Sequence, residues 1–148
     1  MTLENLVNRS LDRVDPDKNT ITRLLTAADG SLANARLEGM TPEGSFDMAY
    51  KAIIQLANAA LQANGYRTLT SVAGHHQTLI QSLPQTIGLD TQKMILLDSL
   101  RKQRNLIDYS GDSVTRELAA EATEHAVELQ KLVVDWLQAN KPELSTTA

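Results

Sequence analysis

The strongest constraint on the fold is a helical repeat of apolar residues that extends over most of the chain. Apolar side chains recur every three or four residues in five stretches, at about 17–37, 42–64, 68–83, 91–109 and 114–139. Most of the 7 glycines and 4 prolines fall between these stretches, where they end one helix or begin the next. Because no alternating β-branched pattern is present, no strand is predicted.

Short connections between these stretches would make neighbouring helices antiparallel. Thr41 and Pro42 form a start signal for the helix at 42–64, and Gly65 ends that helix. Residues 2–14 predict a further short helix, which Pro16 closes.

The sequence therefore predicts an all-α fold, an up-down antiparallel helical bundle with four long helices plus a short N-terminal helix. A chain of 148 residues is the usual size of one domain. It can bury roughly 70% of the surface that its unfolded form exposes. We assign a single domain to residues 1–141 and a flexible C-terminal tail to residues 142–148.

Composition excludes several classes of protein. The chain has no cysteine, which removes disulfides, thiolate zinc sites and cysteine nucleophiles. A net charge of −4 argues against a globally basic nucleic-acid binder, and 3% aromatic residues argue against a stacking platform for single strands. No stretch approaches the roughly 18 apolar residues of a membrane span. We therefore expect a cytoplasmic protein with no membrane partner.

The predicted helix at 91–109 carries a charged residue on its apolar side. Arg104 continues the row of Leu97 and Leu100, so it should point into the bundle or into a cleft at its edge. An inward guanidinium must be paired, because an isolated buried charge is very unfavourable. Asp108, one turn further on, is the expected partner and would orient Arg104.

Two of the three histidines also fall on apolar rows. His76 lies on the row of the predicted helix at 68–83, and His125 lies on that of the last helix. Each is either a hydrogen-bonded core histidine or a catalytic candidate. Together with Asp108 they are acceptable metal ligands, but their spacing matches no metal signature, so no metal and no cofactor is predicted.

Charge is unevenly distributed over the last two helices. Arg101, Lys102 and Arg104 form the only dense basic cluster, which is a modest electrostatic footprint for a phosphate or an acidic partner surface. Acidic residues lie largely on one side of the last helix, which is typical of a solvated face. They are Glu117, Glu121, Glu124 and Glu128.

The basic cluster lies in a segment with a family resemblance. Residues 101–111, RKQRNLIDYSG, resemble the signature of the HEPN superfamily, the higher-eukaryote and prokaryote nucleotide-binding domains. Residues 46–52, 64–67 and 74–76 resemble parts of one bacterial branch of that superfamily. The resemblance covers roughly residues 17–139.

The resemblance implies a bundle of four or five helices that is commonly a homodimer and often pairs with a nucleotidyltransferase. Many HEPN proteins are metal-independent ribonucleases or toxins. In these an Arg holds the scissile phosphate, and a His that follows it, with about four to six residues between the two, acts in acid–base chemistry. Arg104 and Asn105 match the family pattern, but Tyr109, Ser110 and Gly111 stand where the His belongs. A tyrosine, with an ordinary pKa of about 10, is a poor base near neutral pH.

These observations predict a HEPN-like protein that binds a nucleotide or RNA phosphate and has lost ribonuclease activity. Arg104 would hold the phosphate with help from Arg101 or Lys102, while Asn105 and Tyr109 would contribute hydrogen bonds. Two alternatives stay open. One is a non-catalytic dimerisation or partner-binding module, and the other is a toxin-like metal-independent endoribonuclease that uses His76 or His125.

Overall fold

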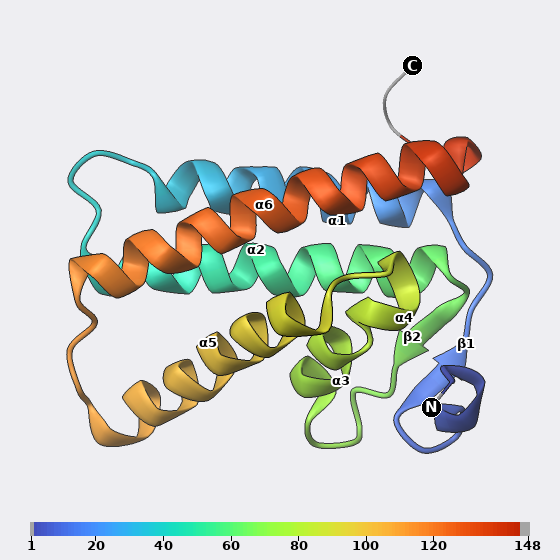
Figure 1. Ribbon diagram of the computed structural model, residues 1–148, viewed down its shortest axis with the longest axis horizontal. Helices are drawn as coiled ribbons and strands as arrows, with labels where there is room; N and C mark the ends of the chain where they lie inside the picture. Colours follow the sequence, from blue (N-terminus) through green and yellow to red (C-terminus); the bar gives the residue numbers. More distant parts are fainter. Residues whose placement is uncertain (1, 146–148) are drawn as a thin grey trace.

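The computed structural model describes residues 2–145, and these are mostly helical (Figure 1). The helices are α1 (Lys18–Ala35), α2 (Pro42–Ala63), α3 (His75–Gln81), α4 (Leu83–Ile87), α5 (Thr91–Ser110) and α6 (Arg116–Asn140). The other elements are the strands β1 (Leu11–Arg13) and β2 (Tyr66–Thr68) and the 3-10 turns η1 (Glu4–Leu6) and η2 (Pro142–Leu144). Each of these helices is too short or too polar to cross a lipid bilayer.

Helix α2 is the centre of the fold. It packs against both α1 and α6, and the three helices lie side by side in Figure 1. Many of its buried residues are alanines, and small side chains let helices approach closely. Larger side chains fill the rest of its buried surface, namely Phe46, Tyr50, Ile53, Leu56 and Leu61. The sequence pattern that predicts α2 therefore also marks the core.

Four of the predicted long helices are confirmed as α1, α2, α5 and α6. Asp17 and Thr41 cap α1 and α2 by accepting hydrogen bonds from the amides of Thr20 and Gly44. Helix α6 is capped by Thr115, whose side chain accepts a hydrogen bond from the amide of Leu118. These side chains satisfy amides that have no partner within the helix.

The predicted N-terminal helix at 2–14 is wrong. Only Glu4–Leu6 form a 3-10 turn, and Leu11–Arg13 form β1, which pairs antiparallel with β2. Asn8 has a positive φ of 69°, which interrupts a helix, and Leu11 is completely buried. A distant pairing partner and one buried leucine thus override a local helical pattern, and the prediction of no strand is wrong as well.

Two further segments differ from expectation. The predicted helix at 68–83 begins only at His75, after Gly74 in a left-handed conformation. Its first part is instead the end of β2 and a loop. Residues 142–145, expected to be a flexible tail, contain η2, and Leu144 is buried. Residues 146–148 lie outside the described part of the chain.

Helix α5 is unevenly packed along its length. It lies against α3, α4 and α2, and its buried residues are Leu97, Asp98 and Leu100, all in its first half. In the second half the side chains of Leu106 and Tyr109 are 63% and 97% exposed. Figure 1 shows this end of α5 diverging from α2 and α6. The polar residues of interest lie at the boundary between the two halves.

Candidate functional site

Three helices bring the polar residues of the candidate site together. Helix α5 carries Arg101 and Arg104, α3 carries His76 and α2 carries Tyr50. Helix α3 packs against both α5 and α2, and α2 also contacts α5. The site is therefore created by the tertiary fold and not by one local motif.

Arg101 belongs to a group that we name the paired cluster, which consists of Asp98, Arg101 and Gln81. The Asp98 carboxylate accepts hydrogen bonds from Arg101 Nε at 2.7 Å and from Gln81 Nε2 at 3.2 Å. Arg101 Nη2 lies 3.4 Å from the second carboxylate oxygen, and the exposed Lys102 places Nζ 3.8 Å from that oxygen. Asp98 is 5% exposed, so a buried carboxylate balances the charge of Arg101.

The pKa of Asp98 reflects these partners. Burial opposes ionisation, but the hydrogen bonds from Arg101 and Gln81 and the charges of Arg101 and Lys102 outweigh it. The pKa of Asp98 therefore lies below its ordinary value, and the residue is ionised at neutral pH.

Arg104 belongs to a different group, which we name the open cluster and which consists of Tyr50, His76 and Arg104. The Cζ atom of Arg104 lies 4.9 Å from the centre of the Tyr50 ring, a cation–π contact. The Tyr50 hydroxyl oxygen lies 3.2 Å from Nδ1 of His76, and the ring of His75 packs edge-on against His76. Arg104 Nε is buried and has no hydrogen-bond partner within residues 2–145. An aromatic ring, and not a carboxylate, thus holds this half-buried guanidinium.

The two titratable rings of the open cluster are both neutral near pH 7. Burial raises the pKa of Tyr50 to about 12, although the charges of Arg104 and Arg101 act in the opposite direction. Burial and the neighbouring charges of His75, Arg104 and Arg101 lower the pKa of His76. The phenol therefore keeps its proton, and the imidazole is uncharged.

The remaining predicted binding residues lie on the exposed part of α5. Lys102, Asn105 and Tyr109 are all exposed, and Tyr109 lies about 140° around the helix from Arg104. They do not converge on the open cluster. Only a ligand that extends along α5 would contact them together with Arg104.

The expected pair of Arg104 with Asp108 is not formed. Asp108 is exposed, and no ion pair joins it to Arg104 anywhere in the described chain. Water solvates a carboxylate at this position well, so an ion pair there would gain little. The carboxylate that orients an arginine of this segment is instead Asp98, and its partner is Arg101.

His125 lies away from the open cluster. It is half-buried on α6, with Nε2 3.8 Å from a carboxylate oxygen of Glu121, and it lines a small cavity with Lys93 and Leu97. Among residues 2–145, no three His, Asp or Glu side chains come together as a metal site. The alternative metal site of His76, His125 and Asp108 is therefore not assembled.

Two residues of these clusters were not predicted from the sequence. Tyr50 lies on the buried side of α2, and the sequence signal for its role is that a buried tyrosine hydroxyl needs a hydrogen-bond partner. Asp98 precedes Arg101 by three residues, which, like the four-residue spacing of Arg104 and Asp108, is a helical pairing distance.

No family model matches this chain, and no curated protein or solved structure matches it either. Its function is therefore inferred from the geometry of the two clusters and from the resemblance in residues 101–111.

Proposed function

We propose that the open cluster binds the phosphate of a nucleotide or of RNA, in a helical bundle of the HEPN type. The observation that carries the proposal is Arg104, a half-buried arginine without a carboxylate partner in the described chain. A guanidinium offers planar, forked donors that match phosphate oxygens, and stacking on a ring fixes its plane. Arg101, one turn away, already has its carboxylate.

The surrounding residues support an anion as the ligand. Arg101 and Lys102 add positive potential beside Arg104, and Lys102 is exposed enough to move toward a ligand. Tyr50 and His76 are neutral and bring no negative charge. Asn105 and Tyr109 would add hydrogen bonds to a ligand that continues along α5.

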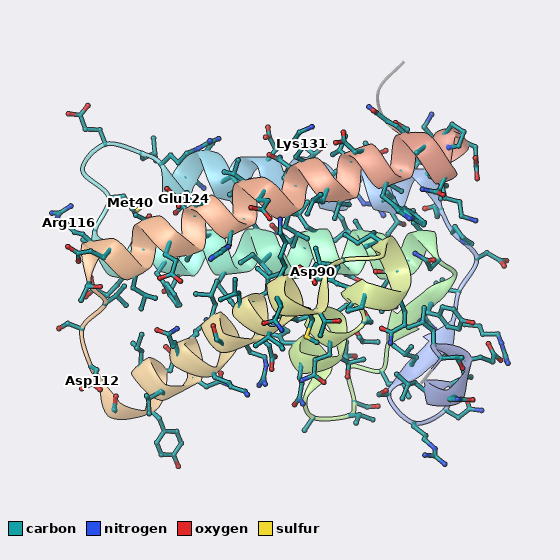
Figure 2. All side chains as sticks on the ribbon, viewed as in Figure 1. Met40, Asp90, Asp112, Arg116, Glu124 and Lys131 are labelled. Carbon is teal, nitrogen blue, oxygen red and sulfur yellow. The ribbon has the colours of Figure 1, made fainter. Side chains whose placement is uncertain are left out.

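Calorimetry tests the phosphate site directly. We expect adenosine monophosphate or a short single-stranded RNA to bind the wild-type protein and to bind Arg104→Ala at least about tenfold more weakly, the scale of charge-assisted hydrogen bonds. Arg116→Ala is the matched control, since it removes the same charge from the exposed N-terminal end of α6 (Figure 2). Absent heats in the wild type, or equal binding by Arg104→Ala, would remove the proposal.

A second candidate function is metal-independent RNA cleavage, and one observation favours it. His76 and Arg104, which lie on different helices, both contact Tyr50. In this reaction His76 would take the proton of a ribose 2′-hydroxyl, whose oxygen attacks the phosphorus. The 5′-oxygen would leave with a proton from water, while Arg104 held the charged phosphate.

End-labelled RNA in the presence of a metal chelator separates the two functions. Binding alone predicts intact RNA with every variant. Cleavage that is lost in His76→Gln and kept in His125→Gln would establish the nuclease. Cleavage that depended on neither histidine would indicate a contaminant.

We also propose that the protein is a homodimer and that the exposed part of α5 contributes to the contact. Leu106 and Tyr109 are large, exposed and about one helical turn apart, as interface side chains often are. Sedimentation at micromolar concentration should give twice the chain mass of 16.2 kDa, and Leu106→Lys should shift it toward the monomer. A wild-type species of 16.2 kDa would contradict the dimer.

A nucleotidyltransferase is the further partner proposed from the HEPN resemblance, and a neighbouring reading frame that encodes one would support it.

A further inference from the structure

Tyr50 contacts both other members of the open cluster, His76 and Arg104. It is 3% exposed and lies where α2 meets α3 and α5. One face of its ring supports the guanidinium of Arg104, and its hydroxyl reaches Nδ1 of His76. The two rings are tilted by 54°, with 5.8 Å between their centres. A change at Tyr50 would therefore alter Arg104 and His76 together.

The direction of the hydrogen bond follows from what each group can do. The Tyr50 hydroxyl keeps its proton at neutral pH, and within residues 2–145 its only hydrogen-bond partner is His76. A buried O–H that donates to nothing is unfavourable, so the hydroxyl donates to Nδ1. An uncharged imidazole that accepts at Nδ1 carries its proton on Nε2.

We infer that Tyr50 is a positioning residue that holds His76 in the Nε2–H tautomer and Arg104 over its ring, so that the site offers donors from both residues. This inference rests on the proposed function, and it separates the two candidates described above. In this tautomer Nε2 donates a hydrogen bond to a phosphate oxygen and has no lone pair for a 2′-hydroxyl proton. The site then binds the phosphate and does not cleave.

Nitrogen NMR of the free protein tests the tautomer without any ligand. With three histidines in the chain, two-bond ¹H–¹⁵N spectra of wild type and His76→Gln identify the His76 signals. We expect a neutral ring with the proton on Nε2 at pH 7. In Tyr50→Phe, which keeps the ring and loses the donor, a mixture of tautomers should appear. A proton on Nδ1 in the wild type, or unchanged signals in Tyr50→Phe, would overturn the inference.

The matched control is Tyr66→Phe. The Tyr66 hydroxyl donates to Glu4 in the N-terminal segment, so its loss should leave the His76 signals unchanged. Should Tyr50→Phe fail to fold, His76→Leu and His76→Gln provide the second test. Leu cannot donate, whereas the Gln amide can place its nitrogen near the position of Nε2.

Binding of inorganic phosphate connects the tautomer to the site. We expect affinity to fall about two- to tenfold in Tyr50→Phe and in His76→Leu, the scale of one neutral hydrogen bond, and to recover largely in His76→Gln. Tyr66→Phe should match the wild type. Wild-type affinity in Tyr50→Phe would overturn the positioning role and leave the phosphate site intact. No binding by the wild type would instead remove the proposed function, and the NMR result would still decide the tautomer.

Discussion

The paired cluster and the open cluster hold two arginines of the same helix, three residues apart, in opposite ways. Arg101 donates to the buried carboxylate of Asp98, which also accepts from Gln81. Arg104 makes a cation–π contact with Tyr50, and its Nε has no acceptor within residues 2–145. Both arginines are half-buried, so burial does not distinguish them. The partner distinguishes them, a carboxylate for Arg101 and an aromatic ring for Arg104.

The difference separates an arginine that is held by a buried carboxylate from one to which the proposed function assigns a ligand. A phosphate that approached Arg101 would have to compete with a buried carboxylate for the same donors. Arg104 has no such competing carboxylate in the described chain, because its partner is an aromatic face that accepts none of its in-plane hydrogen bonds. Two neighbouring arginines in one basic segment thus have different expected roles.

The largest expected effect is the loss of the buried carboxylate. Asp98→Ala leaves Arg101 inside the protein without its counter-charge, which should destabilise the fold by about 3 kcal/mol. Urea denaturation at neutral pH measures it as a lower midpoint with an unchanged slope.

Asp112→Ala is the control for this loss. Asp112 is an exposed acid in the turn after α5 (Figure 2), so its removal should change stability by less than about 0.5 kcal/mol. Equal midpoints for the two variants would show that Asp98 does not hold Arg101 in solution.

The two arginines themselves give the next largest difference. Arg101→Ala leaves the Asp98 carboxylate buried with only Gln81 and Lys102 nearby, and should cost about 2 kcal/mol. Arg104→Ala loses a cation–π contact but also removes a buried nitrogen without a partner, so its net effect should stay within about 1 kcal/mol. Urea midpoints of both variants, measured side by side, decide the order. A larger loss of stability in Arg104→Ala than in Arg101→Ala would make Arg104 the structural residue and would contradict the proposed difference between the two clusters.

Much of the fold could be predicted because it follows from local periodicity. The apolar rows locate α1 and α2 to within a residue or two, and the start signal at Thr41 was also predicted from the sequence. The N-terminal segment could not be predicted in this way, since β1 exists only through pairing with β2, more than fifty residues away. A local pattern cannot report a distant partner.

In the candidate site, too, some features follow from local spacing and others depend on how distant segments pack. The inward position of Arg104 could be predicted from helical spacing, and the structure places it half-buried. Its contact with Tyr50 could not, because it depends on how α2, α3 and α5 pack. That Asp98 and not Asp108 pairs with an arginine depends on which half of α5 is covered by other helices. Helical spacing alone permits both pairs, Asp98 with Arg101 and Arg104 with Asp108.

Acid titration tests the paired cluster through the pH dependence of the unfolding free energy, an effect smaller than those of the alanine variants. Because the folded pKa of Asp98 is below the unfolded value, its stabilisation is complete above the unfolded value and is lost as the pH falls through the folded one. The free energy of unfolding should therefore fall more steeply below about pH 4 in the wild type than in Asp98→Asn. Parallel curves would mean that the carboxylate gains nothing from Arg101 and Gln81.

The smallest expected effect is the pH-dependent stability linked to His76 in the open cluster, which falls in a higher pH range than that of Asp98. The folded pKa of His76 is lowered from 6.5, so the unfolded chain binds the proton first. The associated stability is complete above 6.5 and is lost as the pH falls through the folded value. Tyr50, His75, Arg101 and Arg104 all face this ring, and none of them supplies the negative charge that would reverse the sign. The difference in unfolding free energy between wild type and His76→Gln should therefore shrink on acidification below about pH 6.5. If this difference in unfolding free energy instead grew on acidification, a carboxylate would have to lie beside His76. The open cluster would then hold a compensated charge, as the paired cluster does.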